Sequence, residues 1–209
     1  MALFKARARA LDMLGRQQIA GIPTAISELF KNAHDAYARR VEADLYRPDK
    51  TFTLRDNGLG MTEEDFVERW LTLGTDSKLC AKFGLEAPPV DEDQETRPIM
   101  GEKGVGRLAI ATLGPQVLVL TRAKRDAELG DLVAAFINWE IFESPGLELS
   151  DVQVPLKSFK GGTLPTKAQI EELVPGSLSR RRRARCGHAR DFRSRDASHA
   201  TALLDRTRA

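Results

Sequence analysis

Cysteine is scarce in this chain, with only Cys80 and Cys186 among 209 residues. The two lie far apart and form neither the cysteine framework of a small secreted domain nor the paired spacing of a zinc site. The sequence also lacks an apolar run near the roughly 18 residues that a membrane-spanning helix requires. These absences argue against disulfide-scaffold, zinc-binding and membrane-embedded classes, so we expect a cytoplasmic protein with no membrane partner.

Lysine is missing from residues 177–209, which contain ten arginines, whereas residues 1–176 contain ten lysines and twelve arginines. The formal net charge is −5 for 1–176 and +7 for 177–209. We therefore expect a domain over 1–175 and an arginine-rich, disordered tail over 176–209. Clustered arginines in such a tail would bind the phosphates of nucleic acid. The alternative is an out-of-frame extension or the truncated end of a longer protein, because a shifted frame in a GC-rich gene tends to produce this composition.

The first elements are predicted from local pattern. Apolar residues recur three and four apart over 2–19 and 22–40, and Pro23 suits the first turn of a helix, so two successive helices are expected. Alternation over 41–46 and 51–56 predicts a β-hairpin.

The rest of the domain is predicted to add a helix, a long loop, a second helix and further strands. TEED at 62–65 is a capping box that predicts a helix from Thr62. Residues 74–100 lack periodicity, and loops of that length are usually functional or disordered. Helical spacing resumes over 101–114, and apolar, β-branched runs predict strands over 116–123, 132–142 and 152–156. The pattern predicts an α+β fold, a two-layer sandwich with helices packed on one face of a mixed, mostly antiparallel sheet.

The stretch ISELFKNAHDAY, residues 26–37, places polar side chains on an otherwise apolar helix. Glu28 and Asn32 are one helical turn apart, and Asp35 returns to the same face. A carboxylate against an apolar core is costly unless it has a partner, and a metal ion with bound water would be one. A solvated stripe on a surface helix is the other interpretation of this pattern when it stands alone.

Two glycine-rich segments follow. DNGLGM at 56–61 has Gly58 and Gly60 where main chain can approach a flat ligand, with Asp56 as an acceptor for an exocyclic amine, although such a segment alone is equally typical of a hairpin turn. GEKGVG at 101–106 leads into a helix, where main-chain amides and the helix dipole bind phosphate. Its spacing is neither a dinucleotide-binding fingerprint nor a P-loop.

The order and spacing of these motifs resemble the GHKL ATPase superfamily, which includes gyrase B subunits, heat-shock-90-type chaperones, histidine kinases, MutL and MORC proteins. ELFKNAHDA at 28–36 is similar to its first motif, DNGLG at 56–60 to its second and GEKGVG at 101–106 to its third. GGT at 161–163 is similar to a fourth. The resemblance covers about residues 10–165 and implies the Bergerat ATP-binding fold, with ATP and Mg²⁺ as cofactors.

The resemblance implies a role for each matched residue on the first helix. Glu28 would be the general base that orients and deprotonates the attacking water. Asn32 would give a neutral oxygen to Mg²⁺, which keeps several waters and phosphate oxygens as its other ligands. Asp35 would lie beside the nucleotide, but neither chemistry nor spacing defines its task, and a structural role is the alternative.

The glycine motifs would hold the two ends of the nucleotide. Asp56 would accept from the adenine amino group, and Gly58, Gly60 and Met61 would lie against the ring, with the Thr163 hydroxyl closing this network. The phosphates would be wrapped by the third motif and by two lysines as charge partners; these residues are Gly101, Lys103, Gly104, Val105, Gly106 and Lys78. Residues 75–100 would form a lid that closes over the triphosphate.

The expected activity depends on which branch of the superfamily the chain resembles. Histidine kinases of this superfamily lack the basic glutamate, so Glu28 favours a hydrolase. The sequence on either side of the lid is most similar to that of the MORC and heat-shock-90 branches. Relatives of these branches dimerise when ATP binds, and a second domain supplies a lysine to the γ-phosphate. We therefore expect Mg²⁺-dependent ATP binding, slow hydrolysis and an ATP-dependent homodimer, acting as a conformational switch. The alternative is a non-hydrolysing nucleic-acid-binding module that uses the basic tail.

Overall fold

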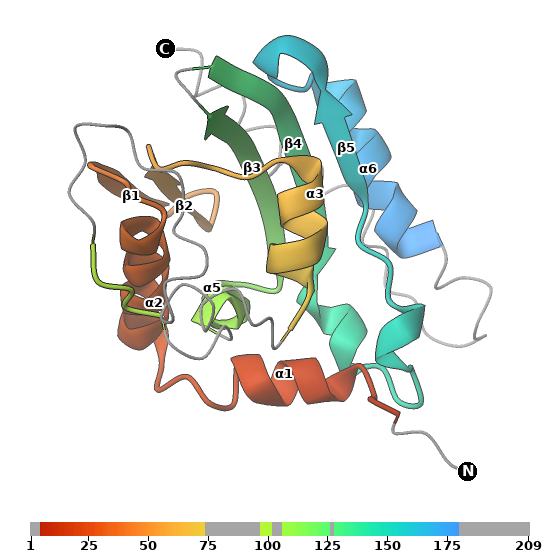
Figure 1. The fold of residues 1–209 in the computed structure, drawn as a ribbon. Helices are drawn as coiled ribbons and strands as arrows, with labels where there is room; N and C mark the ends of the chain where they lie inside the picture. The colour runs from red at the N-terminus through yellow and green to blue at the C-terminus, as the bar shows by residue number, and fades with distance from the viewer. Residues whose placement is uncertain (1–4, 74–96, 102–105, 126–127, 180–209) are drawn as a thin grey trace.

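The computed structural model describes residues 5–73, 97–101, 106–125 and 128–179. Figure 1 shows helix α2 and the strands β1 and β2 on one side of the molecule, and β4, β5 and helix α6 on the other. Most of the predicted lid, and residues 180–209 of the tail predicted over 176–209, lie outside the described residues. Among the described residues, no helix is long and apolar enough to cross a membrane.

The first two helices are shorter than predicted. α1 (Arg9–Gly15) and α2 (Ile22–Asp35) form where the helices 2–19 and 22–40 were expected. α2 ends early because Tyr37 adopts a positive φ of 60°, which no α-helix continues. The hairpin is confirmed as predicted, since β1 (Val41–Tyr46) pairs antiparallel with β2 (Thr51–Asp56).

A three-stranded antiparallel sheet follows, in the order β3 (Gln116–Arg125), β4 (Glu128–Asn138) and β5 (Leu156–Phe159). The strand predicted over 132–142 is wrong beyond Asn138. The Asn138 side chain accepts a hydrogen bond from the Glu140 amide and starts the short helix η3 (Trp139–Glu143). The strand predicted over 152–156 is also shifted, because β5 begins at Leu156.

The capping box predicted at Thr62 is confirmed. The Thr62 hydroxyl accepts from the Asp65 amide, and the Asp65 carboxylate accepts from the Thr62 amide. The α-helical part is only one turn, α3 (Glu63–Asp65), and continues as the π-helix η1 (Phe66–Leu71). The helix predicted over 101–114 is present as η2 (Gly106–Ala109) and α5 (Ile110–Leu113).

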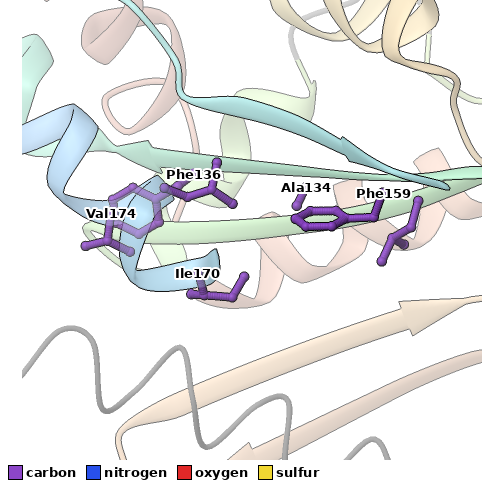
Figure 2. Close-up of a cluster of buried hydrophobic side chains, with 7 residues drawn as sticks. Ala134, Phe136, Phe159, Ile170 and Val174 are labelled. Carbon is purple, nitrogen blue, oxygen red and sulfur yellow. The ribbon is translucent and has the colours of Figure 1, made fainter. Parts of the chain in front are cut away.

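Both faces of the three-stranded sheet are covered. On one face, Leu132, Ala134 and Phe136 of β4 pack against Ile170 and Val174 of α6 (Lys167–Ser179), as Figure 2 shows in part. The intervening residues of β4 point to the opposite face, where Ile137 packs against α1, η2 and α5.

The α+β class and the antiparallel pairing are thus confirmed. The structure differs from the expected arrangement in two respects. The described strands form two sheets instead of one, and the unpredicted α6 adds a helix on the second face of the larger sheet. The reason is that α6 carries apolar residues that cover this face, with Ile170 fully buried.

The N-terminal segment is attached to a distant loop by main-chain hydrogen bonds. The Ala8 amide donates to the Leu147 carbonyl, and the Leu149 amide donates to the Ala6 carbonyl. Between them Arg7 forms an antiparallel bridge with Glu148. Figure 1 shows α1 at the bottom of the view, below α5.

Candidate functional site

Glu28 lies on the side of α2 that packs against η2. Its Oε1 accepts a hydrogen bond from the Lys31 ammonium at 2.7 Å. Its Oε2 faces Gly106, where a Cβ atom would lie only 2.7 Å from that oxygen. A side chain at residue 106 would therefore displace the Glu28 carboxylate.

Asp35 holds the main chain at the other end of the third motif. Its Oδ1 accepts from the Met100 amide at 2.8 Å, and its Oδ2 accepts from the Gly101 amide at 3.0 Å. The Asp35 side chain is 11% exposed. The structure thus gives Asp35 a contact that the sequence left undefined, since it fixes the start of the glycine segment against α2.

Helix α2 therefore contacts both ends of the segment between Gly101 and Gly106. Asp35 binds the amide of the first glycine, and Glu28 lies against the last one. Four predicted site residues lie outside the described residues, so their positions stay predictions; they are Lys78, Lys103, Gly104 and Val105.

Asn32 lies on α2 between these two contacts and is half-buried. Its side-chain amide makes no hydrogen bond with another residue of the described part of the chain. Mg²⁺ binds few protein ligands and completes its octahedron with phosphates and water. A neutral oxygen one helical turn from the Glu28 carboxylate fits that donor set, and the predicted role of Asn32 is compatible with its position.

The second motif packs against the C-terminal end of α2. The Asp56 Oδ1 accepts from the Gly58 amide at 2.9 Å, and the Leu59 amide donates to the Ala36 carbonyl at 2.8 Å. A Cβ atom at Gly58 would approach that Ala36 oxygen to 2.6 Å. Glycine is needed there for packing, and Asp56 itself is exposed at the end of β2, with its other carboxylate oxygen available to a ligand.

The same turn is attached to β3. Gly60 has a φ of +60°, and a Cβ atom there would lie 2.0 Å from the Arg122 carbonyl oxygen. The Met61 amide donates to the Thr121 hydroxyl at 3.0 Å, and the Lys124 amide donates to the Leu59 carbonyl at 2.8 Å. The structure gives Gly60 and Met61 a packing role beside the ligand contact expected of them.

The fourth motif lies at the end of β5, around η5 (Lys160–Gly162). The Thr163 hydroxyl donates to the Lys160 carbonyl at 3.4 Å, and Thr163 is exposed. The Arg122 guanidinium donates to the Gly161 carbonyl at 3.3 Å. No hydrogen bond within the described residues joins Thr163 to Asp56, so its place in an adenine network stays a prediction.

Sequence reasoning missed several residues that organise the site. The Asn57 Oδ1 accepts from the amides of Arg39 and Arg40 at 2.9 and 2.8 Å, which fixes the turn that carries Asp56. Arg97 donates to the Ala38 carbonyl at 2.8 Å, and its guanidinium lies 5.7 Å from the centre of the Tyr37 ring. The position of Asn57 within a turn was a sequence signal for its contacts. The contacts of Arg97 had no such signal, because they join residues far apart in sequence.

Arg107 follows the third motif directly. Its guanidinium donates to the Thr72 carbonyl, and its Nε is buried with no hydrogen-bond partner among the described residues. Burial lowers the pKa of Arg107 from its ordinary value. The contact joins η2 to the end of η1 and thereby fixes the helix that supports Gly106.

This chain is similar to known proteins. The family model described as "Histidine kinase-, DNA gyrase B-, and HSP90-like ATPase" matches residues 21–163. The chaperone protein HtpG of Francisella tularensis subsp. novicida (strain U112) is 36% identical over 99 residues, covering 47% of this chain and 15% of the relative. HtpG of Buchnera aphidicola subsp. Schizaphis graminum is 29% identical over 168 residues, covering 79% of this chain and 24% of the relative.

This chain spans only a small part of those chaperones, between 15% and 24% of their length. Because the family model matches residues 21–163, which include the Glu28 helix and every glycine motif, the chain belongs to the family of histidine kinase-, DNA gyrase B- and HSP90-like ATPases.

Proposed function

We propose that this protein binds ATP with Mg²⁺ and hydrolyses it, and that the nucleotide drives a conformational switch. The observation that carries the proposal is the contact of α2 with both ends of the third motif, through Asp35 at Gly101 and Glu28 at Gly106. A ligand held by this segment would lie beside a helix that carries a carboxylate, an amide and an ammonium. Membership in the ATPase family makes ATP that ligand.

Hydrolysis requires a base that accepts a proton from water. Glu28 is partly buried, with a side chain 22% exposed, which suits a carboxylate that must remain accessible to water. Water would attack the terminal phosphorus as the bond to the β-phosphate oxygen breaks, and Glu28 would take the proton. Mg²⁺, held by Asn32 and the phosphates, would supply charge stabilisation to the leaving group.

Adenine recognition would depend on Asp56. One of its oxygens already accepts from the Gly58 amide, so the other would accept from the exocyclic amine of the base. Asn57 supports this arrangement, because its side chain fixes the same turn to Arg39 and Arg40. An aspartate with two acceptor oxygens can serve both donors, whereas asparagine offers only one.

The test uses the full chain and two substitutions. Asp56→Asn should weaken the equilibrium binding of Mg²⁺-ATP by at least about tenfold, since one acceptor is lost. Glu28→Gln should keep ATP affinity but lower the hydrolysis rate by about 100-fold or more, which is the usual contribution of a positioned base.

Asp151→Asn is the matched control, because Asp151 is exposed in η4 (Leu149–Asp151), far from α2 in sequence. It should change neither binding nor hydrolysis. Unchanged ATP affinity in Asp56→Asn would show that the adenine site lies elsewhere, and full hydrolysis in Glu28→Gln would remove Glu28 as the base.

A further inference from the structure

Lys31 is the one cation in direct contact with the Glu28 carboxylate within the described part of the chain. The two residues form an i,i+3 pair on α2, with the Lys31 Nζ 2.7 Å from Oε1. Their side chains are 35% and 22% exposed. The pair is thus half-buried and remains within reach of solvent and of a ligand.

The contact places an ammonium where it limits the proposed chemistry. A carboxylate oxygen that accepts from an ammonium is less available to accept a proton from water. The second oxygen is enclosed on the side of Gly106, where even a Cβ atom would collide. In the arrangement that the structure describes, the Lys31 ammonium therefore occupies Oε1 of Glu28, while Oε2 lies beside Gly106.

A terminal phosphate would compete for this ammonium. It carries more negative charge than a carboxylate and presents three acceptor oxygens, and lysine is a common phosphate ligand because its charge is compact and its stem flexible. Lys31 lies on the same side of α2 as Glu28 and Asn32, since positions three and four apart on a helix are neighbours. The flexible lysine stem would let the ammonium exchange one partner for the other.

We propose that Lys31 distinguishes ATP from ADP. This inference rests on the proposed ATP-binding function. Without nucleotide it holds Oε1 of Glu28; when ATP binds, its ammonium moves to the terminal phosphate and releases Oε1 for the attacking water. The oxygen of water then bonds to phosphorus, the bond to the β-phosphate oxygen breaks with its electron pair leaving on ADP, and Glu28 takes one water proton. When phosphate departs, Lys31 returns to Glu28.

The experiment compares Lys31→Gln with Lys31→Arg in the full chain. Equilibrium affinities are measured for Mg²⁺-ADP and for a non-hydrolysable Mg²⁺-ATP analogue, and kcat and KM are measured for ATP. Lys31→Gln should lower the affinity for the ATP analogue by about tenfold or more and leave ADP affinity within about twofold. Lys31→Arg, which keeps the positive charge, should retain most of the preference for the ATP analogue over ADP.

Lys157→Gln is the matched control, because Lys157 forms a hydrogen-bonded pair with Glu172 at 3.0 Å and has a similar side-chain exposure of 42%. It should change neither affinity. Equal losses for both nucleotides, or no loss, in Lys31→Gln would overturn the role of Lys31 while the wild type still binds ATP. A wild type that binds neither nucleotide would overturn the proposed function and this inference with it.

Discussion

At the scale of single residues, Arg122 connects two glycine motifs to the larger sheet. Its carbonyl oxygen lies against Gly60, and its guanidinium donates to the carbonyls of Gly130 and Gly161. A Cβ atom at Gly162 would also collide with that guanidinium, at 2.1 Å from Cζ. Glycine at position 60 is required by packing, independently of any ligand, because the obstructing atoms belong to the Arg122 main chain.

Gly60→Ala should be far more destabilising than Gly146→Ala. Both glycines have positive φ, of +60° and +78°, so alanine costs each about 1–2 kcal/mol in backbone strain. Only Gly60 has a backbone atom in the way, since nothing lies within 4 Å of the Cβ position at Gly146. Urea unfolding should show an additional loss of about 1–3 kcal/mol for Gly60→Ala. Equal losses in the two variants would contradict the packing role.

The residue-level prediction of the site was strongest where it depended on helix periodicity. The placement of Glu28, Asn32 and Asp35 on one side of α2 follows from spacing alone. The contact of Asp35 with the amides of Met100 and Gly101 could not be predicted, because it joins positions 65 and 66 residues apart. The Lys31 contact could have been predicted from its i,i+3 spacing to Glu28.

At the scale of elements, an ion pair joins the turn that starts α3 to β3. The Asp65 carboxylate accepts a hydrogen bond from the Thr62 amide and lies 2.9 Å from the Arg125 guanidinium. Burial raises the pKa of Asp65, but the hydrogen bonds from Thr62 and the charges of Arg69 and Arg125 lower it more, so it lies below its ordinary value of 3.8. A carboxyl with a lowered folded-state pKa stabilises the fold above its unfolded-state pKa.

Asp65→Asn should therefore destabilise the protein in a pH-dependent way. At pH 7 the loss in the free energy of unfolding should be about 0.5–2 kcal/mol, as for other N-terminal caps. The difference from wild type should shrink as the pH falls below about 4, where the wild-type carboxyl takes up a proton and loses its advantage. Denaturant unfolding from pH 7 to pH 3 measures this, with Glu64→Gln, an exposed neighbour, as control. A difference that is independent of pH would refute the electrostatic explanation.

Ile170→Ala tests whether α6 is an integral part of the domain. Ile170 is fully buried against β4, and removing such a side chain leaves a cavity that costs about 2–5 kcal/mol. Lys167→Ala in the same helix is exposed and should cost less than about 0.5 kcal/mol. Thermal or urea unfolding compares the two variants, and similar small losses would mean that α6 does not pack on the sheet in solution.

Elements defined by local pattern were predicted well, and those defined by tertiary contacts were not. The hairpin boundaries follow from alternation on either side of the turn at 47–50. Strand β4 was predicted too far along the chain, over 132–142 instead of Glu128–Asn138, and the side-chain cap of Asn138 ends it. Helix α6 was missed although Thr166 and Gln169 form reciprocal capping hydrogen bonds at its start, a signal that the TKAQ sequence contains.

At the scale of the whole molecule, the proposed switch predicts self-association that depends on nucleotide. Sedimentation of the full chain should show a larger species with Mg²⁺ and a non-hydrolysable ATP analogue than with ADP, because the triphosphate would hold the closed form. Asp56→Asn should remain at the size of the nucleotide-free protein. A size that is the same with every nucleotide would contradict the expected ATP-dependent homodimer and leave ATP binding unaffected.

The main-chain bridge between Arg7 and Glu148 has a consequence for synthesis on the ribosome. The Arg7 side chain also donates to the Gly146 carbonyl, a partner 139 residues later. At about 5–20 residues per second, the start of the chain waits roughly 7–28 s for that partner to be made. Contacts of such sequence separation slow folding. The N-terminal segment can therefore complete its contacts with residues 146–149 only after β1, β2, β3 and β4 have been synthesised.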